Sequence, residues 1–470
     1  MRGLIVGALV VLAACQTPVS EPVPVAQPLP ANLIGAAERS RAPGIVAAII
    51  RDGRVVQAYA WGGMACDGSG AADINASYEI GSISKHITAV ALLQLWERNR
   101  VDLDATVGTY LDDIPEAWRR VTLRQLLTHT SGVPDYEEAG GYGVYETSPT
   151  PAQVFAIVSA RPLDFEPGTR WSYSNTGYFL LSLVVQRVSG ERFGDYLREH
   201  LFGPLGMHHT FMGGYAPEGA TLAQGCKPGD APDAPRVDVR PITEASTFGA
   251  GGISSTLADW ALWDEALHGG HILSLRAMEV LFTTQHLADG SDTGYAFGMF
   301  RTEYRGLPRL DHSGQTQGFS ANYEHFPDRD VSMIVFANSY GSRFGGVVRG
   351  LEAQVLPDLS YDRLPVPTDP DPQRTAATRR ALRQIALVEQ PLDLLAPDVR
   401  AAATDPQMRS VLAPLRLHAE HADQVVFLRS DPPDGEYTRD IYKSVIDGET
   451  SYLLFTWHAG LLAGLRIEDE

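Results

Sequence analysis

Strand-like segments at both ends of a long helical stretch place the strongest limit on how this chain can fold. Residues 44–62 hold two β-rich runs joined around Asp52 and Gly53, which indicates a hairpin. Strand patterns return at residues 319–326 and 331–338, and between about 100 and 285 the patterns are mostly helical. We therefore expect an α/β fold with a central antiparallel sheet built from both ends of one domain and a helical subdomain inserted between them.

Four helices can be placed within this scheme. From Ser82 to about Trp96 apolar residues lie on most sides, which predicts a buried helix. Residues 150–160 and 176–190 carry clear helical patterns, and the second ends on Gly190 as a stop signal. A fourth helix is expected from about Ser342 to Gln354.

The length of 470 residues is too great for one ordinary domain, so we expect a large domain and a smaller one. Residues 31–358 form the predicted large domain, and the proline- and aspartate-rich residues 359–374 form a linker. Residues 375–470 carry helical patterns followed by four short strand patterns, which predicts a small α+β domain.

The N-terminus indicates export. Residues 1–14 have a basic residue and a short apolar run, as in a signal peptide. Leu12 to Cys15 resemble the bacterial lipobox, which predicts lipidation of Cys15; an ordinary signal peptide that contains a cysteine is the alternative. Residues 15–30 are proline-rich and predict an extended tether. We expect a periplasmic protein of the bacterial cell envelope, held to the membrane by a lipid anchor or else secreted.

Two further sequence features bear on partners and covalent links. The net charge of −19 argues against a nucleic-acid partner, which would need a basic face. With Cys15 lipidated, Cys66 and Cys226 remain. An oxidising periplasm permits a disulfide between them, and two unrelated free thiols are an equal alternative.

Ser82 and Lys85 form the first candidate for chemistry. They stand three residues apart, so on a helix they share a face. Only three lysines occur in the chain, although Lys+Arg total 38. A buried lysine has a lowered pKa and can take a serine proton as a neutral amine, which arginine cannot do. The alternative is a helix-capping serine beside a snorkelling lysine, and this motif alone favours that alternative.

Two later segments supply further candidates. Tyr173 and Asn175 are two residues apart and can face one pocket as a proton relay and a substrate-positioning amide. His312 and Gly314 lie in a strand pattern, where a glycine suggests close backbone approach by a ligand. The Gln315 N–H could form an oxyanion hole with the Ser82 N–H. Alone, each segment is better explained as structural: a surface loop with a capping asparagine, and a strand histidine.

Together these motifs resemble the beta-lactamase-related serine hydrolases. Ser-x-x-Lys at Ser82, Tyr-x-Asn at Tyr173 and His-x-Gly at His312 occur in that family's order, and the resemblance spans about residues 31–356. That group includes class C beta-lactamases, D,D-carboxypeptidases, D-aminopeptidases and esterases. The resemblance implies a beta-lactamase/transpeptidase-like fold, an acyl-serine mechanism and no metal or organic cofactor.

The resemblance also implies residue roles. Ser82 is the nucleophile, Lys85 the base and Tyr173 a proton shuttle, while Asn175, His312 and Gly314 contact the substrate. Which of Lys85 and Tyr173 takes the first proton stays open.

The sequence departs from class C beta-lactamases at His312, where those enzymes have a lysine that helps to hold the substrate carboxylate. A histidine is largely neutral at pH 7, which favours a peptidase or esterase acting on a small-molecule or peptide-like substrate. Two alternatives are a penicillin-recognising or peptidoglycan-sensing protein that acylates without turnover, and a scaffold that has lost activity. The histidines after Met207 lack ligand-spaced partners, so we expect no metal there.

Overall fold

The computed structural model describes residues 24–140, 150–229, 234–405, 408–431, 433, 435–446 and 449–469. The predicted signal peptide, Cys15 and the first part of the predicted tether lie outside these residues. The chain divides into two compact units, Met1–Pro30 with Arg41–Ser342 and Ala31–Ser40 with Arg343–Glu470, as far as their residues are described. This division places two helices of the predicted large domain with the C-terminal residues, and the domain boundaries drawn from the sequence stay a prediction.

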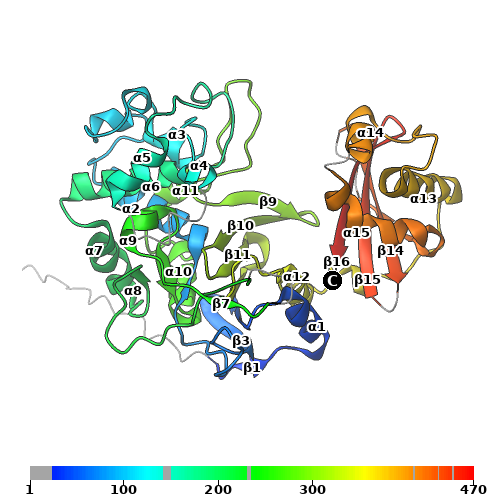
Figure 1. The fold of residues 1–470 in the computed structure, drawn as a ribbon, viewed down its shortest axis with the longest axis horizontal. Helices are drawn as coiled ribbons and strands as arrows, with labels where there is room; N and C mark the ends of the chain where they lie inside the picture. The colour runs from blue at the N-terminus through cyan, green and yellow to red at the C-terminus, as the bar shows by residue number, and fades with distance from the viewer. Residues whose placement is uncertain are drawn as a thin grey trace, which may run out of the picture. The chain divides into compact units, whose positions relative to one another are not determined.

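The first unit is built on a mostly antiparallel sheet (Figure 1). Among the described residues its seven strands have the order β1-β3-β2-β12-β11-β10-β9. They are β1 (Gln27–Pro28), β2 (Gly44–Arg51), β3 (Arg54–Gly62), β9 (Phe300–Tyr304), β10 (Leu307–Gln315), β11 (Ser320–Phe326) and β12 (Val331–Ala337). Because the whole of β12 pairs with β2, the two ends of the domain meet in the middle of the sheet, as predicted.

Local sequence explains the strand connections. Asp52 (φ 45°) and Gly53 (φ 68°) both have positive φ, as a tight hairpin turn between β2 and β3 requires. The structure differs from the predicted tether at its end, because Gln27 and Pro28 pair in parallel with β3. Pro28 is tolerated there because β1 is an edge strand.

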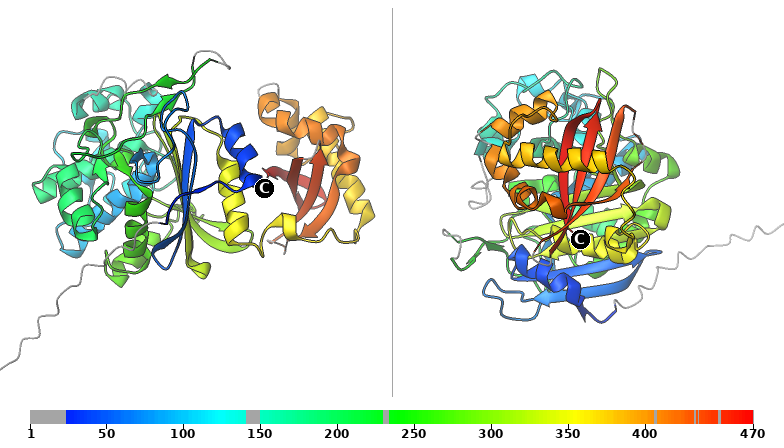
Figure 2. Two further views of the ribbon diagram at one scale, coloured as in Figure 1. Left: turned by 90° about the horizontal axis from the view of Figure 1, so that it is seen from below. Right: turned by 90° about the vertical axis from the view of Figure 1, so that its right-hand side faces the viewer.

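Helices cover one face of this sheet (Figure 2). They are α2 (Ser84–Glu97), α3 (Leu123–Leu127), α4 (Tyr136–Gly140), α5 (Pro151–Val158), α6 (Asn175–Ser189), α7 (Phe193–Leu197), α8 (Gly203–Leu205), α9 (Glu244–Thr247), α10 (Leu257–His268) and α11 (Leu275–Phe282). Two small sheets accompany them: β4 (Tyr78–Glu79), β8 (Ile253–Ser255) and β5 (Phe211–Met212), then β6 (Cys226–Lys227) and β7 (Val237–Asp238).

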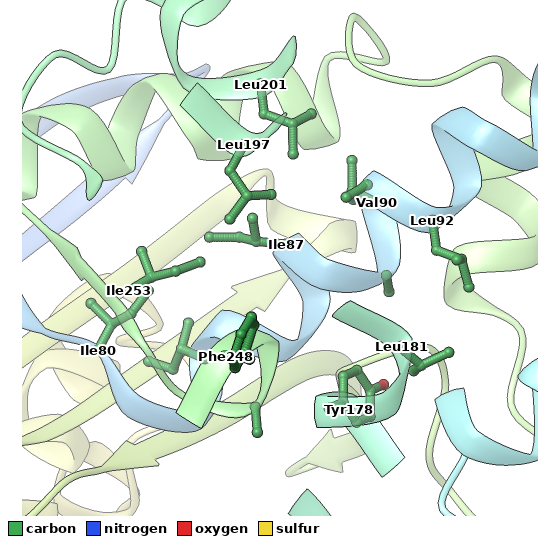
Figure 3. Packing of buried hydrophobic residues seen from close by; sticks show 14 of the residues in the cluster. Ile80, Ile87, Val90, Leu92, Tyr178, Leu181, Leu197, Leu201, Phe248 and Ile253 are labelled. Carbon is green, nitrogen blue, oxygen red and sulfur yellow. The ribbon is translucent and has the colours of Figure 1, made fainter. Parts of the chain in front are cut away.

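Helix α2 runs through the centre of the apolar core, as its all-round hydrophobic sequence predicts. Figure 3 shows Ile87 and Val90 of α2 near Leu197 and Leu201. Packed side chains surround α2, so they also fix the position of the residues just before its first turn. Ser82 lies in that preceding segment, in a 3₁₀ turn over Gly81–Ile83.

Helix α6 begins and ends where the sequence predicts. The Ser174 side chain accepts a hydrogen bond from the Gly177 N–H, and Gly190 caps the other end with φ 83°. This N-terminal cap fixes Tyr173 and Asn175 on either side of Ser174. Asn175, the first residue of α6, contacts Lys85 in the first turn of α2.

The second unit contains α1 (Ala31–Ser40), α12 (Gly345–Val355) and a four-stranded antiparallel sheet with three helices. Its helices are α13 (Pro372–Leu387), α14 (Pro397–Thr404) and α15 (Arg409–Glu420), and its strands are β13 (Val426–Ser430), β14 (Tyr437–Ile446), β15 (Glu449–His458) and β16 (Leu461–Asp469). Leu382, Leu415 and Phe455 meet in its core, so α13 and α15 pack on the sheet. This confirms the predicted small α+β fold. No helix of the described residues is long and apolar enough to cross a membrane.

Candidate active site

Ser82 and Lys85 face one another, as their spacing predicts. The Nζ atom of Lys85 lies 3.0 Å from the Oγ atom of Ser82. Lys85 is fully buried, whereas Ser82 is partly exposed to a cleft. An amine sheltered from water therefore contacts a hydroxyl group that a substrate can reach.

Two further partners fix the orientation of the Lys85 amine. Nζ lies 2.7 Å from the Oδ1 atom of Asn175 and 2.6 Å from the carbonyl oxygen of Ala250. Both of these oxygens can only accept hydrogen bonds. When Lys85 is neutral, its two N–H groups must point to Asn175 and Ala250, so its lone pair points to Ser82 Oγ. This arrangement can remove the proton from the serine hydroxyl.

Burial lowers the pKa of Lys85 to about 7, against a smaller opposing effect of Glu137 and Asp135. Neutral and protonated forms therefore coexist near neutral pH. Burial raises the pKa of Tyr173 well above its usual value of 10, although a hydrogen bond with the Ser82 side chain opposes this. The phenol thus stays protonated under the same conditions, so the neutral amine and not the phenol is available to accept a proton.

Asp135 fixes the amide of Asn175. Its Oδ1 accepts from the backbone N–H of Asn175 and its Oδ2 accepts from Nδ2, both at 3.2 Å. A carboxylate can only accept, so the amide must turn its NH₂ group to Asp135 and its Oδ1 to Lys85. Both ends of the Asn175 amide are thus engaged within the protein, and its expected contact with the substrate stays a prediction.

Tyr173 lies against Lys85 and a group of buried aromatic rings. The Lys85 Nζ atom is 4.7 Å from the centre of the Tyr173 ring. The centre of the His129 ring lies 4.3 Å from that of Tyr173 with the two planes tilted by 36°, and His129 Nδ1 accepts a hydrogen bond from the Ser174 N–H. His129 therefore holds both the ring of Tyr173 and the backbone that follows it.

His312 points into this aromatic group and is buried. Its Nδ1 donates to the carbonyl oxygen of Ser313 at 2.6 Å, so its Nε2 accepts from the hydroxyl of Tyr295 at 3.2 Å. Burial, and then the charge of Lys85, lower the pKa of His312 to about 3. It is thus a neutral residue that supports the aromatic group, and it offers no positive charge to a substrate.

Gly314 allows close approach of two backbone segments of the protein, and its expected contact with the substrate stays a prediction. A Cβ atom at this position would lie 1.8 Å from the carbonyl oxygen of Ile80. A Cβ at Gly81, whose φ is 52°, would lie 2.4 Å from the backbone nitrogen of Gln315. The two glycines let the turn of Ser82 pack directly on β10. This brings the backbone of Gln315 beside that of Ser82, as an oxyanion hole formed by their N–H groups requires.

Cys66 and Cys226 form a disulfide, which resolves the alternative left open by the sequence. The Cys226 N–H also donates to the carbonyl oxygen of Gly318, in the loop between β10 and β11. The disulfide therefore braces the segment that follows Gln315.

The described side chains include a group whose spacing could hold a metal ion. Asp264, His268 and His325 have ligand atoms within 4.8 Å of one another. However, the Tyr323 hydroxyl donates to Asp264, and His325 Nδ1 bonds to the Ser332 hydroxyl at 2.8 Å. We interpret this group as a hydrogen-bonded structural network. Among the residues described, His208 and His209 belong to no such group.

Three contributors to the site were not predicted from the sequence: Asp135, His129 and the carbonyl of Ala250. The residue types of Asp135 and His129 were visible, in a segment similar to the related hydrolases, but their contact with residues 173–175 depends on the fold. The role of Ala250 could not be predicted from its residue type, because any residue supplies a carbonyl oxygen.

Comparison with known proteins finds similarity to penicillin-binding proteins, D-aminopeptidases and amidohydrolases. A D-aminopeptidase of Brucella canis is 26% identical over 319 residues, which are 67% of this chain and 60% of that protein. A crystal structure of a D-stereospecific amidohydrolase from Streptomyces sp. superimposes with a TM-score of 0.58 at 28% identity, covering 69% of this chain and 97% of that one.

A penicillin-binding protein homologue from Pyrococcus abyssi, octameric in its structure, shares the fold over 93% of this chain and 98% of its own, with a TM-score of 0.60 at 20% identity. Residues 29–356 match the family described as Beta-lactamase, and the chain belongs to that family. The chain spans 60% to 66% of the length of the curated relatives it matches first.

Proposed function

We propose that this protein is a serine hydrolase that cleaves amide or ester bonds through an acyl-enzyme on Ser82. The observation that carries the proposal is the set of three partners around Lys85 Nζ, two of which can only accept hydrogen bonds. They direct the lone pair of the neutral amine to the serine hydroxyl. A capping serine beside a solvated lysine would need neither burial of the amine nor these two acceptors.

In the proposed acylation, Ser82 Oγ bonds to the carbonyl carbon of the substrate while its proton passes to Lys85 Nζ. The N–H groups of Ser82 and Gln315 bind the developing oxyanion. Tyr173, whose phenol stays protonated, gives its proton to the leaving nitrogen or oxygen and regains one from Lys85. The bond between carbonyl carbon and leaving group then breaks.

In the proposed deacylation, a water molecule attacks the acyl-serine and Lys85, neutral again, takes the water proton through Tyr173. The bond between the carbonyl carbon and Oγ breaks, and the proton returns to Ser82. The relatives include a D-aminopeptidase and a D-stereospecific amidohydrolase, so amides of amino acids are the first substrates to test.

We also propose that the protein is located in the bacterial cell envelope. The N-terminal sequence supports export and lipidation of Cys15. The Cys66–Cys226 disulfide supports an oxidising compartment such as the periplasm.

Covalent labelling tests the proposal on the full chain. A fluorophosphonate probe should add to Ser82, as peptide mass spectrometry can locate, and Ser82→Ala should abolish the addition. We expect Lys85→Arg to lower turnover of p-nitrophenyl esters by ~10⁴-fold, since arginine stays protonated. Lys443→Arg, in the other unit, is the matched control and should retain full activity.

The same assays examine the alternative of a protein that is acylated without turnover. A fluorescent penicillin that labels Ser82 quickly, with no release and no hydrolysis of esters or amides, would support that alternative. Labelling of another residue, or wild-type rates in Lys85→Arg, would contradict the proposed chemistry.

A further inference from the structure

Phe248 has a backbone conformation that phenylalanine rarely adopts, with φ 42° and ψ −137°. The Cβ atom of any residue is crowded in this region, so such a conformation persists only where the surrounding structure enforces it. Phe248 directly follows α9 and stands two residues before Ala250, whose carbonyl oxygen accepts a hydrogen bond from Lys85. The strained residue therefore belongs to the short turn that supplies one of the two acceptors of the amine.

Packing of the Phe248 ring holds this conformation in place. The residue is 5% exposed, and its ring centre lies 4.8 Å from that of Phe179 in an edge-to-face arrangement. Figure 3 shows the Phe248 ring among the buried side chains of the core. Phe179 belongs to α6, the helix that begins with Asn175. The ring of Phe248 thus ties the turn of Ala250 to the helix that supplies the other acceptor of the amine.

A hydrogen bond fixes the next residue of the turn to helix α2. The buried Thr88 side chain donates through Oγ1 to the carbonyl oxygen of Gly249 at 2.8 Å. Thr88 lies one turn after Lys85 in α2. The backbone that joins Phe248 to Ala250 is therefore attached to the helix that carries the amine, and the carbonyl of Ala250 keeps one direction.

The direction of this carbonyl decides what the amine can do. With both acceptors in place, the two N–H groups of neutral Lys85 are used and its lone pair faces Ser82. Without the acceptor of Ala250, one N–H group would turn to Ser82 Oγ, and the amine would donate to the serine instead of removing its proton. The protonated amine would also lose an acceptor, so the pKa of Lys85 would fall.

Other titratable groups face the Lys85 amine from several elements. They are Asp135, Glu137, His129, Tyr173, Tyr178 and His312. None of them belongs to residues 247–250, so a change confined to this turn acts on the amine through the Ala250 carbonyl.

We propose that Phe248 is a positioning residue of the hydrolase: its ring enforces a strained turn that directs the carbonyl of Ala250 to the amine of Lys85. This inference rests on the proposed hydrolase function. Phe248 is not one of the described residues that line the cleft at Ser82, so its effect on the reaction passes through the backbone.

Substitutions at position 248 test the proposal. The measurements, per folded protein, are kcat/KM for a neutral p-nitrophenyl ester as a function of pH and the rate at which a fluorophosphonate labels Ser82. In Phe248→Ala the ring is lost but the crowding at Cβ remains, so the turn should relax. We expect kcat/KM and the labelling rate to fall by about 10- to 100-fold, and the midpoint of the rise with pH to move about one unit below that of wild type.

Phe248→Gly is the decisive variant. Glycine adopts a φ of 42° without crowding, so the turn needs no ring to enforce it. Phe248→Gly should therefore retain more activity than Phe248→Ala, although it leaves the larger cavity. A side chain that only fills the core would give the opposite order.

Three further variants complete the set. Phe248→Leu refills the space and should stay within about threefold of wild type. Phe248→Val is crowded at Cβ and keeps an apolar side chain, so it replaces the alanine variant in the comparison with glycine if that variant does not fold. Phe326→Ala removes another buried phenylalanine, whose ring contacts Tyr304, and should lower stability while the folded protein keeps the wild-type kcat/KM and midpoint.

Wild-type rates in Phe248→Ala would overturn this inference and leave the hydrolase proposal intact. A glycine variant no more active than the alanine variant would overturn it as well, and so would a loss of activity with an unchanged or higher midpoint. Failure of the fluorophosphonate to label Ser82 in wild type would instead overturn the hydrolase proposal, and this inference with it.

Discussion

At the scale of single residues, the Ser82 and Lys85 pair could be predicted because a spacing of three residues fixes their relation in any helix or 3₁₀ turn, and the lowered pKa of Lys85 predicts a pH dependence. The orientation of His312 could not be read from its motif, since it depends on a contact with Tyr295, 17 residues earlier in the chain. Burial lowers the pKa of Lys85 from 10.5 to about 7, so the protonated form dominates below that pH and the neutral base above it. For an uncharged N-acetyl ester, kcat/KM should rise about tenfold per pH unit up to about pH 7 and then level off. A rate that continues to rise toward pH 10, after correction for spontaneous hydrolysis, would show that the amine keeps its ordinary pKa.

Asp135 gives a second prediction at this scale. In Asp135→Asn the new amide can donate or accept, so Asn175 can flip and present its NH₂ group to Lys85. We expect kcat to fall by ~10-fold or more with KM nearly unchanged. The rise of activity with pH should also move below pH 7, because the Asp135 charge raises the pKa of Lys85.

The pH profile distinguishes positioning by Asp135 from a purely structural role. A variant that is only destabilised would lose activity without moving the rise in its profile. Asp113→Asn, an exposed carboxylate elsewhere in the same unit, is the control and should leave both kcat and the profile unchanged.

At the scale of helices and strands, long and strongly patterned elements were predicted and short ones were not. The β2–β3 hairpin and α6 have turn and cap residues that fix their ends. Strands β1 and β4 have two residues each, so they show no periodicity, and only tertiary pairing creates them. The contact of β10 with the turn of Ser82 was likewise not predictable from the sequence pattern, because it joins backbones rather than side chains.

This backbone contact makes Gly314 sensitive to the smallest substitution. In Gly314→Ala the new Cβ would lie 1.8 Å from the Ile80 carbonyl oxygen, so the two segments must separate. Thermal unfolding should show a loss of about 1–3 kcal/mol, and labelling of Ser82 should slow. Gly464→Ala is the control, since its Cβ would lie 3.6 Å from the nearest atom and should alter neither quantity.

At the scale of the whole chain, the sequence predicted a large hydrolase domain, a linker and a small α+β domain, and the structure has the corresponding sheets. A proline-rich linker can be predicted from composition. The assignment of α1 and α12 to the second compact unit cannot, because it depends on contacts between residues distant in the chain. The pairing of Cys66 with Cys226 also needed the fold, because sequence does not give the distance between two Cα atoms.

The disulfide should stabilise the unit that carries the active site. It joins residues separated by 160 positions, so it strongly restricts the unfolded chain. Replacing both cysteines with alanine should lower the free energy of unfolding by about 2–5 kcal/mol, measured by denaturant titration. A reducing agent should destabilise wild type by a similar amount and leave the double variant unaffected; equal sensitivity of both proteins would exclude this role.

The span of this covalent link also has a practical consequence for making the protein. Ribosomes must add 160 further residues after Cys66 before its partner exists, so the link closes late in synthesis or after it. A host whose cytosol is kept reducing would yield chains with both sulfur atoms as thiols. Counting free thiols in each purified batch should therefore precede any comparison of rates between variants.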